Sequence, residues 1–272
     1  MNILLKNIDM QKIMDSGQCF RIKKLDTDRY LVPSGEEACI CVQRGKNIEI
    51  IASSLNSEEY WRTYFDESYS YRDLEDRMSN CIFLSDMSTF GSGLRRLNQD
   101  SWECLVSYII SQRKSVKAIR TAVEKLCKMY GKRYTLSGFE WYTFPTAKKL
   151  KEVYKSKGTY DASLGYRDDY VYSASVYSLD GEFLKYVSTI PYYEAKKELK
   201  KIYGVGDKVA DCTLLYSFGF NQAFPVDVWI SRYISHNDYF EDVNNLFKSE
   251  MGIVQLYIYY YMRNHKDEEE EV

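Results

Sequence analysis

The stretch LKKIYGVGDKVADCTLLYSFGFNQAFPVDV, residues 199–228, combines two helical patterns with a glycine turn between them. The first helix is expected over residues 193–203, because apolar residues recur there at helical spacing, namely Ala195, Leu199 and Ile202. Gly204, Val205 and Gly206 then interrupt the pattern. Two helices joined by so short a turn leave backbone N–H groups pointing outward at a helix N-terminus, where they can hold a phosphate group.

Lys208 has an unusual place at the start of the second expected helix. Asp207 is a residue type that caps helices, so we expect it as the N-cap, with Lys208 in the first turn and Cys212 one turn further along the same face. The positive end of the helix dipole repels a cation and therefore favours the neutral amine. Because a lysine with a lowered pKa is nucleophilic, Lys208 is the candidate catalytic nucleophile.

A second acidic residue, Asp227, follows Pro225 and precedes an apolar run at residues 228–230. This order predicts that Asp227 caps a third helix, which would fix its carboxylate in place. Taken singly, a glycine turn, a lysine and a capping aspartate are common structural features. Their ordered combination is not, and it indicates a functional site.

This combination resembles the helix-hairpin-helix, Gly/Pro-Asp superfamily of DNA glycosylases, and within it the bifunctional 8-oxoguanine DNA glycosylases. The matching residues are Gly204, Gly206, Lys208, Val-Ala-Asp-Cys at 209–212 and Pro-Val-Asp-Val at 225–228. One departure is Tyr203, where the family hairpin usually has proline before its first glycine. The resemblance implies a lysine that attacks the sugar and forms a Schiff base, and an aspartate that stabilises the positive charge of the sugar.

The same resemblance implies how the hairpin is used. Its residues Gly204, Val205 and Gly206 would hold the DNA backbone. The family hairpin also binds a monovalent cation, Na⁺ or K⁺, through backbone carbonyls, here those of Lys200, Ile202 and Val205. The chemistry itself would require no cofactor.

The overall composition is that of an ordinary globular protein, with 272 residues, 45% hydrophobic and 28% charged. The formal net charge of −2 is misleading for a DNA-binding protein, because residues 267–271 contribute five negative charges and the rest of the chain carries +3. Lysines also cluster at residues 148–157 and 196–201. Local clusters of this kind can attract phosphate even when the total charge does not.

The cysteines and histidines offer no metal site. Seven cysteines include no C-x-x-C pair, and the histidines are two, so neither zinc nor an iron–sulfur cluster is expected. The endonuclease III and adenine glycosylase branches of the superfamily usually carry a four-cysteine iron–sulfur cluster, and this sequence lacks that cysteine pattern. Free cysteines suit a reducing cytoplasm, or the nucleus in a eukaryote. The N-terminal segment lacks a signal-peptide core, and no apolar run approaches membrane-spanning length.

The N-terminal part is expected to form a small antiparallel sheet, because alternating segments are separated by turn residues. The expected strands are residues 16–23, 30–32, 38–42 and 48–52. Asn56 with Glu59 predicts a cap that opens a helix. The segment Ser-Gly-Gln-Cys-Phe-Arg at 16–21 also resembles the family, in which the glycine carbonyl faces the damaged base. Because 8-oxoguanine carries hydrogen on N7 where guanine has an acceptor, the carbonyl of Gly17 could bind the lesion and repel the normal base.

Two further segments are expected to contact DNA. Gln112, Arg113 and Lys114 form a polar turn between two helices with buried faces, which suits the gap left by an extruded base. The family has asparagines here. The eukaryotic enzymes place an arginine at the position of Ala118, so these departures from the family predict a relaxed preference for the opposite base. Tyr166 and Arg167 resemble the family's wedge tyrosine and the arginine that contacts the orphaned cytosine.

The final helix supplies the remaining wall of the expected base pocket. Gln255 and Tyr259 are four residues apart and therefore share one helix face. They resemble the family's glutamine, which reads the pairing edge of the base, and its phenylalanine, which stacks on it. Cys212 would form the opposite wall. In the alternative interpretation, Tyr259 only packs on the protein core, as part of a tyrosine-rich helix.

The sequence thus predicts a mainly α, α+β protein, with an N-terminal antiparallel sheet at residues 1–85, a helical glycosylase core at 86–266 with its hairpin near 193–218, and an acidic tail at 267–272. The predicted function is a monomeric DNA glycosylase and abasic-site lyase that acts on double-stranded DNA containing 8-oxoguanine. A monofunctional alkyl-base glycosylase and a non-enzymatic DNA-binding protein are the alternatives. The former would release bases without nicking, and the latter would bind damaged and intact duplex alike.

Overall fold

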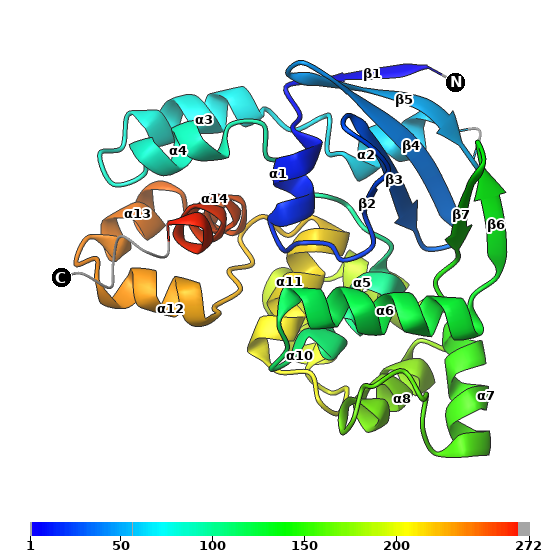
Figure 1. The fold of residues 1–272 in the computed structure, drawn as a ribbon. Coiled ribbons are helices and arrows are strands. Elements are labelled where there is room, and N and C mark those ends of the chain that lie inside the picture. Colours follow the sequence, from blue (N-terminus) through cyan, green and yellow to red (C-terminus); the bar gives the residue numbers. More distant parts are fainter. Residues whose placement is uncertain (1, 56, 266–272) are drawn as a thin grey trace.

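A computed structural model describes residues 2–55 and 57–265, which form a twisted sheet and a larger body of helices (Figure 1). The strands are β1 (Ile3–Lys6), β2 (Lys23–Lys24), β3 (Arg29–Ser34), β4 (Glu37–Arg44), β5 (Asn47–Ser53), β6 (Arg133–Leu136) and β7 (Phe139–Tyr142). The helices are α1 (Met10–Asp15), α2 (Glu58–Tyr64), α3 (Tyr71–Ser79), α4 (Ser85–Gly91), α5 (Ser101–Ser111), α6 (Val116–Tyr130), α7 (Ala147–Lys157), α8 (Arg167–Tyr177), α9 (Glu182–Thr189), α10 (Tyr192–Leu199), α11 (Asp207–Phe218), α12 (Val228–Ser235), α13 (Phe240–Leu246) and α14 (Met251–Asn264).

The five-stranded sheet has the order β1-β5-β4-β3-β2, and all neighbouring strands are antiparallel. Alternate residues of β3 and β4 enter two different cores, so both strands are buried on both faces. One face packs against α1 and α2, where Trp61 is fully buried. The other face is covered by the β6–β7 hairpin through Trp141. The mainly helical α+β class with an N-terminal antiparallel sheet is therefore confirmed.

The expected strand at residues 16–23 is wrong, because only Lys23 and Lys24 pair with a neighbour, Leu31 and Tyr30 of β3. The polar residues that produced the alternating pattern do not face water. Gln18 is 1% exposed and donates from Nε2 to the Arg95 carbonyl oxygen at 2.8 Å. The strand β1 and the helix α1 are not among the elements expected from the sequence. The helix expected after Asn56 is present as α2 and is capped by Ser57, while Asn56 itself lies outside the described residues.

The helical body is centred on α5, which packs against α11, α8 and α6. The apolar faces predicted for these helices are buried, including Leu105 and Ile109 of α5 and Val123 and Leu126 of α6. Helices α12, α13 and α14 lie on the opposite side of the molecule from α7, and α14 packs against α4 and α12 (Figure 1). Among residues 2–55 and 57–265, no helix combines the length and the apolar composition needed to cross a membrane.

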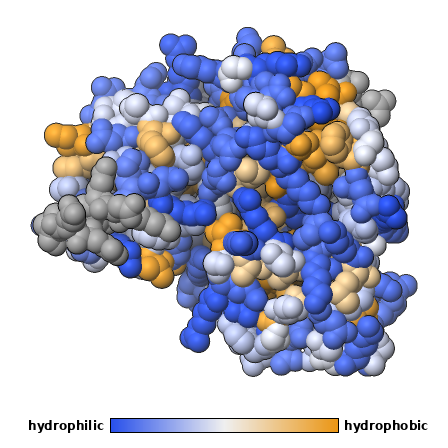
Figure 2. Space-filling model, viewed as in Figure 1, coloured by the Kyte–Doolittle hydropathy of each residue, from blue (hydrophilic) through white to orange (hydrophobic). Residues whose placement is uncertain are grey.

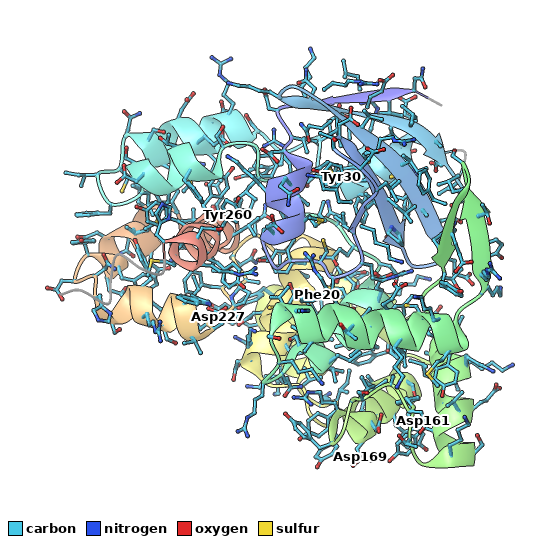
Figure 3. All side chains as sticks on the ribbon, viewed as in Figure 1. Phe20, Tyr30, Asp161, Asp169, Asp227 and Tyr260 are labelled. Atoms are coloured by element: carbon cyan, nitrogen blue, oxygen red, sulfur yellow. The ribbon has the colours of Figure 1, made fainter. Side chains whose placement is uncertain are left out.

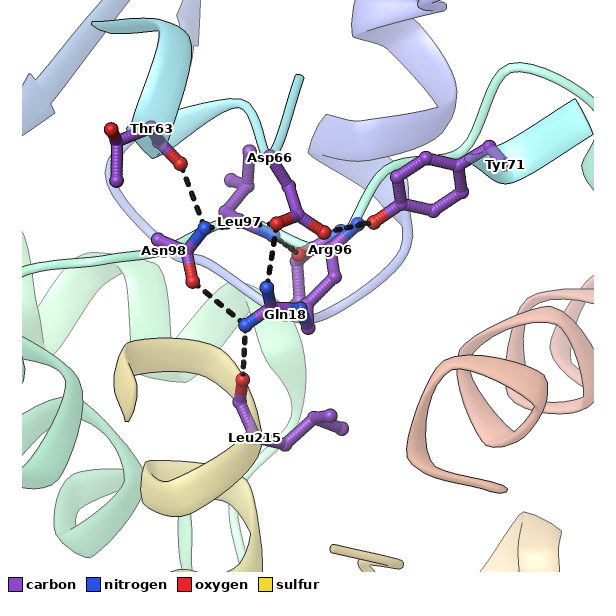
Figure 4. A network of polar contacts seen from close by, with 8 residues as sticks. All are labelled: Gln18, Thr63, Asp66, Tyr71, Arg96, Leu97, Asn98 and Leu215. Atoms are coloured by element: carbon purple, nitrogen blue, oxygen red, sulfur yellow. Dashed lines mark hydrogen bonds and ion pairs between the residues drawn. The ribbon is translucent and has the colours of Figure 1, made fainter. Parts of the chain in front are cut away.

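A buried polar network joins the N-terminal region to the helical body (Figure 4). At its centre is Arg96, 4% exposed, whose Nη2 pairs with Oδ1 of Asp66 at 2.7 Å. Nη1 of the same guanidinium donates to the carbonyl oxygen of Leu215, in α11, at 3.0 Å. The backbone N–H of the next residue donates to Oε1 of Gln18 at 2.8 Å. The network therefore fixes the segment after α1 relative to α11.

Candidate active site

The turn between α10 and α11 has the predicted hairpin form. Gly204 adopts a φ of +86°, and a Cβ atom there would lie 2.1 Å from the ring of Tyr170, so both its conformation and its surroundings require glycine. Gly206 is the N-cap of α11 and has open space around its Cα. The helix start is therefore accessible to a ligand from outside.

The capping role expected for Asp207 is wrong. Asp207 is the first residue of α11, and no side chain caps this helix. Its carboxylate instead accepts from Nζ of Lys200 at 2.9 Å and pairs with Lys196 at 3.3 Å. Pairing with Lys200 lowers the pKa of Asp207. Because no capping side chain covers them, the first N–H groups of α11 stay available to hold an anion.

A buried carboxylate holds the two hairpin helices together. Asp211, 4% exposed, accepts from Nζ of Lys196 at 2.8 Å and from the hydroxyl of Tyr192 at 2.7 Å. Burial raises the pKa of Asp211, although Lys196 opposes this effect. Since Asp211 lies on the same helix as Lys208, these contacts fix the backbone that carries that lysine.

Lys208 and Asp227 both line one cavity of about 330 Å³. Lys208 is exposed, and no hydrogen bond or ion pair fixes its Nζ within the described part of the chain. Its predicted neutral state stays a prediction. Asp227 is the N-cap of α12, as expected, and its Oδ1 accepts from the backbone N–H of Ile230 at 3.0 Å. The cavity is thus lined by an amine that is unpaired among the described residues and by a carboxylate that is fixed by its own helix.

The cavity also contains every residue predicted for the base pocket: Gly17, Cys212, Gln255 and Tyr259. Arg113 and Lys114, predicted to contact DNA, line it as well. In the view of Figure 3, Phe20 and Asp227 mark two sides of this region, between α6, α11 and α12. On the surface of the same face, hydrophilic side chains predominate, and a small hydrophobic area lies near the centre (Figure 2).

The walls of the pocket come from distant parts of the chain. Gly17 has a φ of +75°, and a Cβ atom there would lie 3.0 Å from Cε1 and from the hydroxyl of Tyr259, so the two residues are in close contact. On the other side, Cys212 is 3% exposed, and burial raises the pKa of its thiol to about 12. Gln255 also lines the cavity and donates from Nε2 to the Pro225 carbonyl oxygen at 3.0 Å. The lining of the cavity thus includes a buried thiol and an aromatic ring, and their predicted role as the two walls of a base slot stays a prediction.

The turn after α5 reaches the hairpin. Gln112 donates from Nε2 to the Gly204 carbonyl oxygen at 3.0 Å. Arg113 adopts a φ of +52° and is exposed, while Lys114 donates to the Ser163 carbonyl oxygen at 3.0 Å. The left-handed conformation of Arg113 turns the chain sharply, so that its side chain lines the mouth of the cavity.

Tyr166 and Arg167 lie outside the cavity lining and next to this turn. Tyr166 is 47% exposed, and its predicted role as a wedge stays a prediction. Arg167 is 7% exposed, and its guanidinium donates to the carbonyl oxygens of Gln112 at 2.8 Å and Leu164 at 2.9 Å. It also lies over the ring of Tyr166, 4.4 Å from its centroid. Arg167 thus links Tyr166 to the turn after α5, and its contact with an orphaned base stays a prediction.

Several cavity residues were not predicted. Phe20, Tyr108, Tyr216, Trp229 and Arg263 line the same space. Helical spacing gave a usable signal for two of them, because Tyr216 follows Cys212 and Arg263 follows Tyr259 by one turn. The hydroxyl of Tyr216 donates to Oε1 of Gln255 at 3.4 Å. The aromatic floor made by Phe20 and Tyr108 has no comparable signal, because these residues come from separate segments.

The carbonyls predicted to bind a cation lie in the hairpin turn. The carbonyl oxygen of Ile202 accepts from the backbone N–H of Val205 at 3.0 Å. Within the described part of the chain, no hydrogen bond reaches the carbonyl oxygens of Lys200 and Val205. Two of the three expected ligands are therefore unsatisfied acceptors, which is compatible with a hard monovalent cation.

Comparison with known proteins identifies the class as DNA glycosylases with lyase activity. A family model described as 8-oxoguanine DNA glycosylase, N-terminal domain, matches residues 1–105. A probable N-glycosylase/DNA lyase of Methanothermobacter thermautotrophicus is 30% identical over 225 residues, which is 74% of this chain and 70% of that protein. The N-glycosylase/DNA lyase of Saccharomyces cerevisiae is 31% identical over 160 residues, covering 54% of this chain and 42% of that protein.

Solved structures extend the match to nearly the whole chain. The 8-oxoguanine glycosylase/lyase of Clostridium acetobutylicum, in complex with double-stranded DNA containing cytosine opposite 8-oxoguanine, superposes with a TM-score of 0.84. Its sequence identity is 28%, and the superposition covers 97% of this chain and 96% of that one. The chain belongs to the 8-oxoguanine DNA glycosylase family.

Proposed function

We propose that this protein excises 8-oxoguanine from double-stranded DNA and then nicks the strand at the resulting abasic site. The observation that supports this most directly is that one cavity holds both the lysine and the aspartate of the hairpin region and all four predicted base-pocket residues. The chemistry and the base recognition therefore share one space. Family membership supports the same activity.

In the proposed reaction the lesion nucleotide leaves the helix and its base enters the slot between Cys212 and Tyr259. A thiol whose pKa is raised to about 12 by burial stays neutral there and offers an apolar face. The carbonyl of Gly17 accepts the hydrogen on N7 of 8-oxoguanine, which guanine lacks. Oε1 of Gln255 accepts from the pairing edge of the base, because the opposite end of that amide is held by Pro225.

The lone pair of Nζ of Lys208 then attacks C1′ of the deoxyribose, and the glycosidic bond breaks with its electron pair going to the base. Asp227 stabilises the positive charge that develops on the sugar. Ring opening converts the adduct to a Schiff base. Loss of a proton from C2′ expels the 3′ phosphate and nicks the strand, and water then releases the lysine.

The proposed reaction on DNA also indicates which ion, oligomeric state and location to expect for the protein. The unsatisfied carbonyls of Lys200 and Val205 support a structural Na⁺ or K⁺ in the hairpin, while the chemistry needs no cofactor. The protein would act as a monomer wherever the DNA lies, in the cytoplasm of a cell without a nucleus or in the nucleus of a eukaryote. Because position 118 is alanine, the protein would discriminate only weakly among the bases opposite the lesion.

Borohydride trapping on a duplex with 8-oxoguanine tests the nucleophile. The wild-type protein should form a covalent complex, and Lys208→Gln should bind the duplex without forming one. Lys114→Gln is the matched control, because Lys114 lines the same cavity and should still be trapped when protein saturates the DNA. Trapping that survives Lys208→Gln would exclude this lysine. Base release without nicking by the wild-type protein would favour a monofunctional enzyme.

A further inference from the structure

Three tyrosine rings form a continuous row from the wedge to the hairpin. The ring centroids of Tyr166 and Tyr170 are 5.4 Å apart at an angle of 70°, and those of Tyr170 and Tyr203 are 4.9 Å apart at 90°. The middle ring is partly buried, whereas Tyr166 is 47% and Tyr203 64% exposed. Edge-to-face contacts of this kind are favourable and hold each ring in one orientation. The row therefore presents two fixed, exposed aromatic ends.

Tyr203 fastens the hairpin to α8 in a way that a proline could not. Its backbone N–H donates to Oγ of Ser173 at 3.1 Å, and proline has no N–H. The ring of Tyr170 fills the space beside Gly204 that a side chain would otherwise occupy. The hairpin turn thus contacts α8 in two ways. The backbone N–H of Tyr203 binds Ser173, and the ring of Tyr170 packs against both Gly204 and the ring of Tyr203.

A second set of contacts closes the connection between wedge and hairpin. Gln112 donates to the carbonyl oxygen of Gly204, and its own carbonyl oxygen accepts from Arg167. Arg167 lies over Tyr166. The wedge, the turn after α5 and the hairpin are consequently held in one arrangement before any DNA is bound. Tyr203 belongs to the same arrangement through its contacts with Tyr170 and Ser173, so its position is also set before DNA binds.

The lysines before the hairpin turn are engaged in ion pairs, so an uncharged side chain can contribute to DNA binding beside them. The three lysines that precede the hairpin turn already have carboxylate partners: Lys196 with Asp211, Lys200 with Asp207 and Lys201 with Glu198. Each would have to leave its partner before it could neutralise a phosphate. Among the described residues, the side chain of Tyr203 has no such competitor: its ring is 64% exposed, and the residue stands three positions before Gly206, the N-cap of α11.

We infer that Tyr203 is a further DNA-contacting residue, whose ring packs on the sugar–phosphate backbone of the strand that the hairpin holds. This rests on the proposed function, since the hairpin must hold DNA for the contact to form. The partner is the deoxyribose face of the strand, which offers apolar surface to an aromatic ring. The contact continues the surface of Tyr166 and is independent of base identity.

The test is the affinity for a duplex containing a tetrahydrofuran abasic analogue, which cannot be cleaved. Tyr203→Ala should bind about fivefold to tenfold more weakly, because an aromatic contact is lost. Tyr203→Phe should bind within about twofold of wild type, because the ring remains. Tyr193→Ala is the matched control: Tyr193 is 80% exposed at the far end of α10 and should leave affinity unchanged.

Two further measurements separate contact from folding and from chemistry. The plot of affinity against salt concentration should keep its slope in Tyr203→Ala, because no charge is removed. The single-turnover rate of base release at saturating protein should also stay within about twofold of wild type, because Tyr203 is outside the cavity lining. Unchanged affinity of Tyr203→Ala, or an equal loss in Tyr203→Phe, would overturn the inference. A wild-type protein that binds the analogue but releases no base would instead overturn the proposed function.

Discussion

Gly17→Ala is the substitution that most directly tests the proposed base pocket. The change adds one methyl group where the backbone has a φ of +75° and where the new Cβ would lie 3.0 Å from both Cε1 and the hydroxyl oxygen of Tyr259. The backbone favours glycine in this region, and the ring must move by a few tenths of an ångström to admit the methyl group. Both effects act on the slot that is proposed to hold the base.

The expected cost in stability is modest. A left-handed conformation costs an alanine about 1–2 kcal/mol relative to glycine. For a chain of 272 residues this corresponds to a decrease of roughly 2–4 °C in the unfolding temperature. The variant should therefore be fully folded at 25 °C, and its activity can be interpreted.

The effect on activity should depend on whether a base is present. Release of 8-oxoguanine under single-turnover conditions should slow by about tenfold or more, which corresponds to about 1.4 kcal/mol of lost interaction with the base. Nicking of a preformed abasic site should stay within about threefold of wild type, because no base then occupies the slot. Lys208 and Asp227 are unchanged in both assays.

Gly45→Ala is the control. Gly45 has a φ of +60° and nothing within 4 Å of an added Cβ, so the variant bears the backbone cost without touching the pocket. It should lose a similar amount of stability and retain full base release. If Gly17→Ala released 8-oxoguanine at the wild-type rate, or slowed abasic-site nicking equally, the contact between Gly17 and the base would be refuted.

Three other predictions concern the hairpin, the polar network and the buried thiols. Gly204→Ala should destabilise the protein by about 3 kcal/mol, because the methyl group meets the ring of Tyr170 in a left-handed turn, and calorimetry that found no change would contradict this packing. Asp66→Ala should lower the free energy of unfolding by about 3–5 kcal/mol, because Arg96 is left buried without its partner. Denaturant titration against Asp66→Asn, which keeps hydrogen-bonding oxygen at that site, checks it; equal losses would show that charge pairing is unimportant. Stability should fall as the pH rises from about 9 toward 12, because burial raises the thiol pKa of Cys19, Cys127 and Cys212 from 9.0 to about 12. The folded state then retains protons that the unfolded state has lost, and unfolding titrations across that range measure the effect.

Much of the fold could be predicted because its signals are local. The helical period of α5, α6 and α11 reflects one buried face each, and the capping role of Asp227 depends on a hydrogen bond to a residue three positions away. The strand expected at residues 16–23 failed for a different reason. Its alternation of apolar and polar residues is real, but the polar members bind carbonyl and amide groups of distant segments, as Gln18 does.

Site residues that belong to one sequence motif could be predicted. Residues that are brought together from several segments were harder to predict. Asp207 has the right type for a cap, yet two lysines of the preceding helix bind its carboxylate instead, and only the folded hairpin brings them together. Arg167 matches a DNA-contacting residue in sequence but donates to backbone carbonyls in the free protein. Phe20 and Tyr108 line the cavity through tertiary packing, which no local pattern records.

The contact between Gly17 and Tyr259 joins the first turns of the polypeptide to its last helix, and Arg263 of that helix donates to the carbonyl oxygen of Asp15 at 2.8 Å. The lysine and the aspartate of the site lie between these two segments in the sequence, and they do not depend on this contact for their own positions. Loosening the contact would therefore be expected to impair the distinction between damaged and intact guanine more than the chemical step.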